Sequence, residues 1–197
     1  MQDPAARPAR ERLLAAAGEL FYASGIAATG VDAVLRHAGV SPATMYAHFG
    51  GKDALVAAYL ERRHEVWRRT WDEVLAGRTD PAARLLSVFD AVAAYRQDSG
   101  SRRGCGFLAA ATELPAGHPG QRWLDADSRL LVDRLRELAA DAGAPDADDL
   151  AATLLLLYDG VLSRFARQAT TPELPDDDVL ARARALAARA ITASLSG

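Results

Sequence analysis

The stretch GVDAVLRHAGVSPATMYAHF, residues 30–49, combines two short helical patterns with a tight turn between them. In the first pattern, apolar residues recur at every third or fourth position, which is typical of an amphipathic helix. Gly39 ends this helix, because glycine tolerates the positive φ that a tight turn requires. Ser41 and Pro42 begin the second helix, since serine is a favoured N-cap and proline fits the first helical position. The order of helix, turn and helix predicts a helix-turn-helix.

The second helix of this motif, expected over residues 42–48, is too short and too polar to be stable by itself. Met45 and Phe49 share one face and are predicted to anchor the helix to a core. The glycine pair at residues 50–51 then breaks it. The opposite face carries small and hydrogen-bonding side chains, which suit the major groove of DNA.

The flanking helices add further positions where a phosphate group could bind. A helix is predicted over residues 10–24, and a long amphipathic helix begins near Lys52 and ends near Ala76. Thr29 is the predicted N-cap of the middle helix, with Asp32 three residues later approximating a capping box. Three helix N-termini then follow one another closely in the chain, and their free N–H groups favour phosphate. Lys52 is also the only lysine among 23 basic residues.

The composition favours an all-α protein. The chain has 197 residues, is rich in alanine, and shows no sustained strand-like alternation. Its net charge is −3, and basic and acidic residues balance over residues 1–55, so bulk charge does not decide for or against a nucleic-acid partner. Further helices are predicted, which makes about nine in all, over residues 82–98, 104–113, 119–142, 146–169 and 176–195.

Several classes of protein are disfavoured. Cys105 is the only cysteine, so an internal disulfide framework and a cysteine-based metal cluster are excluded, and no metal or cofactor is expected. Cys105 with His118 as a base lacks an orienting carboxylate and an oxyanion element at a known spacing, so we expect no enzyme activity. The longest apolar run, Leu154–Tyr158, is too short to cross a membrane, and no segment resembles a signal peptide. We therefore expect a cytoplasmic protein.

The stretch from Arg10 to Leu60 resembles the N-terminal domain of the TetR/AcrR family of transcriptional regulators. The family resemblance implies a helix-turn-helix DNA-binding domain over residues 1–51 and an effector-binding and dimerisation domain over residues 52–197. Residues 104–108 and 113–115 resemble the sixth-helix segment of a subgroup of the family. The N-terminal resemblance is carried by Ala16–Phe21, Gly25, Thr29, Val31, Asp32, Ala38–Ser41, Thr44, Tyr46, His48, Phe49 and Lys52–Leu55.

The resemblance also implies DNA-contacting residues. Ala43, Thr44 and Tyr46 would face the groove or its rim, and Arg36 would add a base or phosphate contact. Other readings stay open: Tyr46 could pack on the first helix, and His48 could make a structural hydrogen bond. Lys52 could equally be a solvated surface residue. The phosphate contacts that the resemblance implies are Thr29, Ser41, Tyr46, His48 and Lys52.

An effector pocket between the fourth and eighth helices is a further implication of the resemblance. Pockets in helical bundles are lined by aromatic side chains with a few polar groups, although core packing also explains each such residue. The candidate ligand-binding residues are Trp67, Trp71, Tyr95, Phe107, Thr112, Trp123 and Tyr158.

The last two predicted helices favour a homodimer. The helix over residues 146–169 is apolar around most of its surface and must be covered on both sides. A two-fold partner would cover it and would present two recognition helices to a near-palindromic DNA operator. We therefore predict a homodimeric, ligand-responsive repressor that a small molecule releases from DNA. The alternative is a small helical enzyme or ligand carrier that binds no DNA. The small-residue stripe predicted on the last helix consists of Ala183, Leu186, Ala187, Ala190 and Ile191.

Overall fold

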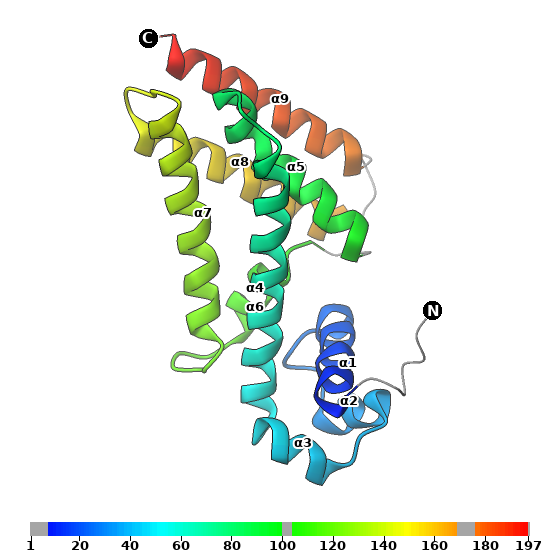
Figure 1. The fold of residues 1–197 in the computed structure, drawn as a ribbon. Coiled ribbons are helices and arrows are strands. Elements are labelled where there is room, and N and C mark those ends of the chain that lie inside the picture. Colours follow the sequence, from blue (N-terminus) through cyan, green and yellow to red (C-terminus); the bar gives the residue numbers. More distant parts are fainter. Residues whose placement is uncertain (1–7, 100–103, 169–175, 197) are drawn as a thin grey trace. The chain divides into compact units, whose positions relative to one another are not determined.

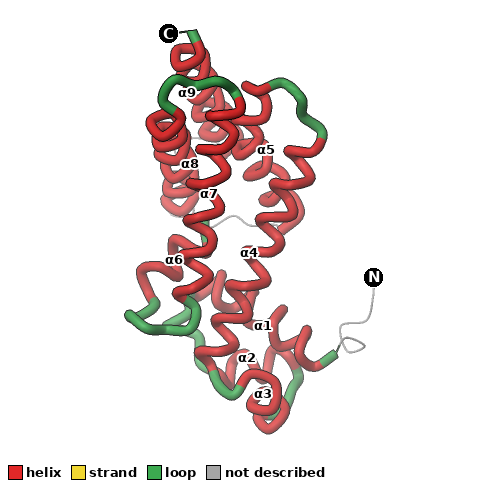
Figure 2. The backbone as a smooth tube through the Cα atoms, turned by 60° about the vertical axis from the view of Figure 1, so that its left-hand side comes forward, coloured by secondary structure: helices red, strands yellow, loops and turns green. Residues whose placement is uncertain are grey.

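The computed structural model describes residues 8–99, 104–168 and 176–196. Every regular element within these ranges is a helix, which confirms the all-α prediction (Figures 1 and 2). No helix in the described ranges is both long and apolar enough to cross a membrane. The helices are α1 (Ala9–Ser24), α2 (Val31–Ala38), α3 (Pro42–Phe49), α4 (Lys52–Ala76), α5 (Pro81–Ser99), α6 (Gly106–Glu113), α7 (Gln121–Asp141), α8 (Ala147–Gln168) and α9 (Asp176–Leu195).

The helices form two compact units. The first comprises residues 1–64 and 106–126, and the second comprises residues 65–105 and 127–197. Helices α4 and α7 therefore contribute residues to both units. The functional boundary predicted after residue 51 stays a prediction, and residues 1–7 of that first domain lie outside the described residues.

The core of the first unit holds the short helices in place. Leu13 and Ala17 on α1 are fully buried, as is Met45 on α3. Phe21 packs edge-on against Tyr59 of α4, with ring centroids 5.5 Å apart. Burial of such side chains contributes about 1.5–3 kcal/mol each, so α2 and α3 are stabilised by packing more than by their own helical propensity.

The turn between α2 and α3 has the predicted geometry. Gly39 lies in the left-handed region with φ 60°, and the N–H of Val40 donates to the carbonyl of Leu35 at 3.2 Å. Ser41 is the N-cap of α3, and Pro42 occupies its first turn. These contacts confirm the predicted end of α2 at Gly39 and the predicted start of α3 at Ser41 and Pro42.

The N-cap predicted for α2 is wrong. Gly30 is the N-cap, and no side chain caps this helix. The Thr29 side chain is instead buried, and its hydroxyl donates to the carbonyl of Gly25 at 2.6 Å. A threonine hydroxyl satisfies a nearby carbonyl as readily as a helix N–H, and here the carbonyl of the preceding turn was closer.

The second unit is built around large buried side chains from several helices. Trp71, Phe89 and Phe165 are almost completely buried, and α9 packs on both α5 and α8. The apolar residues of α8 lie on two sides of the helix. Leu154 and Phe165 are buried, whereas Leu156 is 73% exposed. The core of this unit therefore uses one side of α8 and leaves another open.

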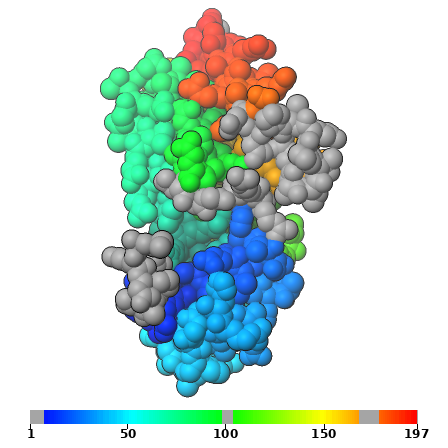
Figure 3. Space-filling model, turned by 90° about the vertical axis from the view of Figure 1, so that its right-hand side faces the viewer, coloured from blue at the N-terminus to red at the C-terminus, as the bar shows by residue number. Residues whose placement is uncertain are grey.

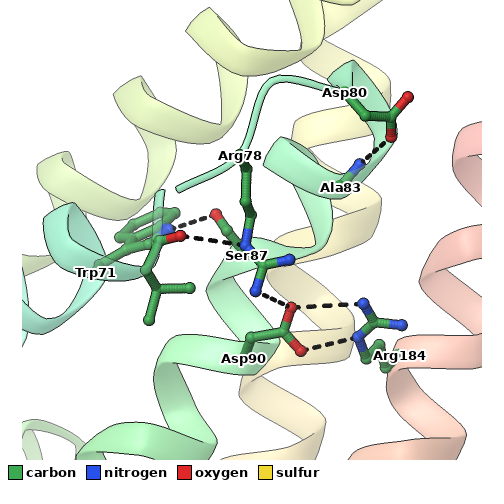
Figure 4. A network of polar contacts seen from close by, with 8 residues as sticks. Trp71, Arg78, Asp80, Ala83, Ser87, Asp90 and Arg184 are labelled. Carbon is green, nitrogen blue, oxygen red and sulfur yellow. Dashed lines mark hydrogen bonds and ion pairs between the residues drawn. The ribbon is translucent and has the colours of Figure 1, made fainter. Parts of the chain in front are cut away.

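A polar network links α5 to its neighbours within the second unit (Figure 4). Trp71 Nε1 donates to the buried Ser87 hydroxyl at 2.9 Å. Asp90 lies between two arginines: Arg184 Nε donates to Oδ1 at 2.9 Å, and Arg78 Nη2 lies 2.9 Å from Oδ2. Asp90 thus ties α5 to α9 and to the segment that follows α4.

Candidate nucleic-acid interface

The outer face of α3 is open to solvent. Tyr46 is 56% exposed, which is unusual for an aromatic side chain, and Ala43 and His48 are also exposed. Figure 3 shows the light-blue atoms of α2 and α3 at the surface of the first unit. More than half of the Tyr46 side chain is therefore available for contact with another molecule, while its partial packing on α1 stays an alternative.

The inner face of α3 fixes how this surface is presented. Met45 is fully buried and Phe49, four residues later, is 9% exposed, so the two side chains lie one above the other on the core face. The guanidinium of Arg10 lies over the Phe49 ring, 5.4 Å from its centroid. The predicted division of α3 into an anchoring face and an open face is confirmed.

Polar contacts at the start of α3 order its first turn. The Ser41 hydroxyl accepts a hydrogen bond from the Thr44 N–H at 3.2 Å, and the two side-chain hydroxyls lie 2.8 Å apart. Ser41 is exposed and Thr44 is half-buried. The cap satisfies one of the free N–H groups at this end and leaves others that can meet an anion.

Three other predicted contacts lie on neighbouring elements. Arg36 is exposed in the last turn of α2, and Lys52 is half-buried at the first position of α4. Lys52 Nζ donates to the carbonyl of Ala27 at 3.5 Å, a long bond that leaves most of its charge available. The Thr29 hydroxyl is buried and already donates to the carbonyl of Gly25, so it is not positioned to donate to a phosphate.

Four of the seven predicted effector residues form one cluster in the second unit. Trp67 lies at its centre: its ring centroid is 5.8 Å from that of Trp71 and 5.9 Å from those of Tyr95 and Tyr158. Trp67 Nε1 is buried and has no hydrogen-bond partner. Burial raises the pKa of the Tyr158 hydroxyl well above its usual value, with smaller contributions from neighbouring groups that include Cys105.

The other three predicted effector residues lie in the first unit. Phe107 is buried, and Trp123 is half-buried with its ring centroid 5.8 Å from that of His64. Thr112 is exposed, and its hydroxyl donates to the carbonyl of Ala109 at 2.8 Å. Their role toward a ligand stays a prediction.

Comparison with known proteins gives one family. A family model described as bacterial regulatory proteins of the tetR family matches residues 13–59. The chain is 33% identical to a candidate TetR-type transcriptional regulator of known structure from Streptomyces avermitilis, with a TM-score of 0.70, and the match covers 90% of this chain and 98% of that one. This chain belongs to the TetR family of transcriptional regulators.

Other transcriptional regulators resemble the chain over different lengths. The TetR-family regulator SCO4454 from Streptomyces coelicolor has a TM-score of 0.84 and 27% identity, covering 95% of this chain and 96% of that one. LmrA of Bacillus subtilis is 29% identical over 108 residues, which is 53% of this chain and 57% of LmrA. UidR of Escherichia coli is 37% identical over 60 residues, 30% of this chain and 31% of UidR. The matches thus span less than two thirds of either curated relative. These proteins are transcriptional regulators, which agrees with the prediction that the chain is not an enzyme.

Two polar side chains of this TetR-family chain contact the α1–α2 turn and the first turn of α4, and neither was predicted as a site residue. Glu113, at the end of α6, accepts a hydrogen bond from the Ala27 N–H through Oε2 at 2.6 Å. His118 Nε2 lies 3.5 Å from Asp53 Oδ1 in the first turn of α4. Glu113 does fall in the segment that resembles the sixth helix of a subgroup, but nothing local in that motif indicates which group it contacts.

Proposed function

We propose that this TetR-family chain is a homodimeric repressor that binds a near-palindromic operator through α3 and is released by a small molecule. The observation that carries the proposal is the open face of α3, with Tyr46 56% exposed opposite the buried Met45. Such a helix can enter a major groove without losing its anchor. Because a regulator of bacterial genes acts where the DNA is, we place the protein in the cytoplasm.

The proposed DNA contacts divide into two groups. Ala43, Thr44 and Tyr46 meet base edges or the groove rim, where a methyl group and a hydroxyl can contact thymine or a hydrogen-bonding edge. The phosphate contacts come from side chains and helix N-termini, which position the protein without reading sequence. The residues proposed to contact phosphate are Arg36, Ser41, Tyr46, His48 and Lys52.

A second copy of the chain is proposed to cover the open side of α8 and α9. Leu156 is 73% exposed and Leu186 is 49% exposed, which is unusual for two leucines on neighbouring helices of one unit. The buried Ala183, Ala187 and Ile191 belong to the core of the same chain, so this part of the predicted stripe does not supply the interface. A two-fold dimer would present two recognition helices roughly 34 Å apart, one helical turn of DNA.

The effector is proposed to bind against the aromatic cluster around Trp67. Its buried Nε1 offers a hydrogen bond to an acceptor on a ligand, and the rings of Tyr95 and Tyr158 offer apolar contact. Trp67 belongs to α4, the helix that begins at Lys52. A ligand that changes the tilt of α4 would change the separation of the two recognition helices, and a coupling of about 1–3 kcal/mol releases DNA severalfold to a hundredfold.

Titration of duplex DNA from the region upstream of the chain's own gene tests DNA binding. The double variant Tyr46→Ala with Lys52→Ala should weaken binding and reduce its salt dependence, because one phosphate-neutralising cation is lost. Arg69→Ala is the matched control, since Arg69 is an exposed cation on the part of α4 in the second unit. Equal affinity of wild type and double variant at moderate salt would refute the assigned contacts.

Sedimentation tests the dimer separately. Leu156→Glu places a charge on the proposed interface and should shift the chain toward monomer. Leu108→Glu is the control, because Leu108 is also an exposed leucine, 49% exposed, but lies on α6. A dimer that survives the Leu156 variant unchanged would exclude this face.

A further inference from the structure

Helix α6 belongs to the same compact unit as the proposed DNA-binding helices, although about forty residues of the second unit separate them in the chain. Its first residue, Gly106, lies tightly against α4. A Cβ at Gly106 would come within 2.6 Å of Arg63 Nε and 3.1 Å of the Tyr59 hydroxyl. The start of α6 therefore packs closely against the Arg63 and Tyr59 side chains of α4, and a side chain at residue 106 would require the Arg63 side chain to move.

The last residue of α6, Glu113, lies against the turn between α1 and α2. Its Oε2 accepts the Ala27 N–H at 2.6 Å, a short hydrogen bond to a carboxylate. A Cβ added to Gly25 would meet Glu113 Oε1 at 3.0 Å, so the carboxylate lies in a space that this glycine leaves open. The Glu113 carboxylate thus accepts the Ala27 N–H and also fills the space beside Gly25.

The turn that Glu113 contacts also holds elements of the proposed DNA surface. The carbonyl of Ala27 accepts a hydrogen bond from Lys52 Nζ, and the carbonyl of Gly25 accepts one from the Thr29 hydroxyl. Thr29 directly precedes Gly30, the N-cap of α2. This turn therefore contacts Lys52 and leads directly into the start of the helix-turn-helix.

We propose that Glu113 is a positioning residue for DNA binding: through it, α6 holds the α1–α2 turn, and with it Lys52 and α2, in the arrangement that fits DNA. This inference rests on the proposed function, since it assumes that the first unit binds DNA. It adds a second route, besides α4, by which a change elsewhere in the chain reaches the DNA surface.

The negative charge of Glu113 means that the direction of the change in DNA affinity, on removal of this side chain, tests the proposal. A carboxylate near bound DNA repels phosphate, so a Glu113 without a positioning role would weaken binding, and its removal would strengthen binding. If Glu113 positions the turn, its removal weakens binding instead. Loss of one partly exposed hydrogen bond to a carboxylate corresponds to about a threefold to tenfold weaker affinity.

The experiment titrates upstream duplex DNA with the full-length wild type, Glu113→Ala, Glu113→Gln and Asp125→Ala at several salt concentrations. Asp125 is the control because it is an exposed carboxylate of the same unit, on α7. We expect Glu113→Ala to bind threefold to tenfold more weakly with an unchanged salt slope, because no phosphate contact is lost. Glu113→Gln keeps an acceptor oxygen and should lie between wild type and Glu113→Ala. Equal or tighter binding by Glu113→Ala overturns the proposal.

A second measurement does not depend on DNA. In the amide spectrum of the free protein, the Ala27 proton should move to higher field in Glu113→Ala and stay in place in Asp125→Ala. An unmoved Ala27 proton would show that the carboxylate does not bind the turn, and the inference fails even if DNA binding stands. If wild type binds no upstream DNA while the Ala27 proton moves, the proposed function fails and the positioning role for DNA fails with it. Thermal unfolding of each variant identifies any that is misfolded, and Glu113→Gln, the milder change, then decides.

Discussion

Replacement of Ser41 by alanine should raise the population of the opened form of α3. The Ser41 hydroxyl accepts the Thr44 N–H at 3.2 Å and lies 2.8 Å from the Thr44 hydroxyl, so the variant loses the side-chain cap of this helix. Loss of a serine N-cap costs about 1 kcal/mol. Helix α3 has eight residues, and besides this cap it is held by the buried side chains of Met45 and Phe49.

The expected size follows from that free energy. Because 1.4 kcal/mol is a factor of ten in an equilibrium constant, about 1 kcal/mol makes the opened form of α3 about fivefold more populated. Amide hydrogen exchange on the free protein measures this directly, since local opening controls the exchange of helix amides. We expect the amides of α3 to exchange about fivefold faster in Ser41→Ala.

Two further variants separate the cap from the phosphate contact proposed for Ser41. Asparagine and aspartate are both good N-caps, so Ser41→Asn and Ser41→Asp should restore the exchange rates of wild type. Only aspartate adds a negative charge beside the proposed phosphate. We therefore expect Ser41→Asn to bind DNA nearly as wild type does, and Ser41→Asp to bind much more weakly, most of all at low salt.

Two results would refute this reasoning. Unchanged exchange of the α3 amides in Ser41→Ala would mean that the hydrogen bond to Thr44 does not hold the helix. Equal DNA affinity of Ser41→Asp and Ser41→Asn would mean that no phosphate approaches Ser41.

Three other predictions concern the scaffold. Ser87→Ala leaves the buried Trp71 N–H without an acceptor and should lower the free energy of unfolding by about 1–3 kcal/mol in urea titrations, with Ser87→Thr as the variant that keeps a hydroxyl. Gly39→Ala forces an L-residue to φ 60° and should cost about 1–2 kcal/mol in thermal unfolding, whereas Gly39→Asn should cost less; equal losses would argue against a left-handed turn. Burial raises the pKa of Tyr158 in the folded state, so its contribution to stability is complete below about pH 10 and is lost as the pH rises further, because the unfolded chain releases that proton first. Tyr158→Phe should therefore lose less stability between pH 9 and pH 11 than wild type does, and parallel curves would contradict the shift.

Local features of the sequence predicted the helices and the anchoring of α3 well. Helix bounds agree within about two residues, because glycine, proline and serine stand where the helices end and begin. Met45 and Phe49 were identified as core residues from their spacing alone, and both are buried. Thr29 shows the limit of such reasoning. Its spacing to Asp32 resembles a capping box, but its hydroxyl donates to the carbonyl of Gly25 and does not cap α2. Sequence does not tell which of two nearby partners a hydroxyl will reach.

Contacts between distant segments could not be predicted in this way. Glu113 and Ala27 are 86 residues apart, and no periodicity along the chain encodes their meeting. The aromatic candidates for the effector site illustrate the same limit. The family resemblance groups them in one pocket, whereas the fold divides them, with Trp67 and Tyr158 in the second unit and Trp123 in the first.

The chain passes between its two units at three points, one inside α4, one just before α6 and one inside α7. The boundary falls inside α4 between residues 64 and 65, just before α6 between residues 105 and 106, and inside α7 between residues 126 and 127. Helix α4 runs without a break from Lys52 to Ala76, and the proposed effector response uses this continuity to reach Lys52. The passage at residue 106 leads within one short helix to Glu113 and the α1–α2 turn. The Ala27 N–H donates to Glu113 and the Ala27 carbonyl accepts a hydrogen bond from Lys52, so α6 and α4 both contact the turn that leads to α2, which is why we propose Glu113 as its positioning residue.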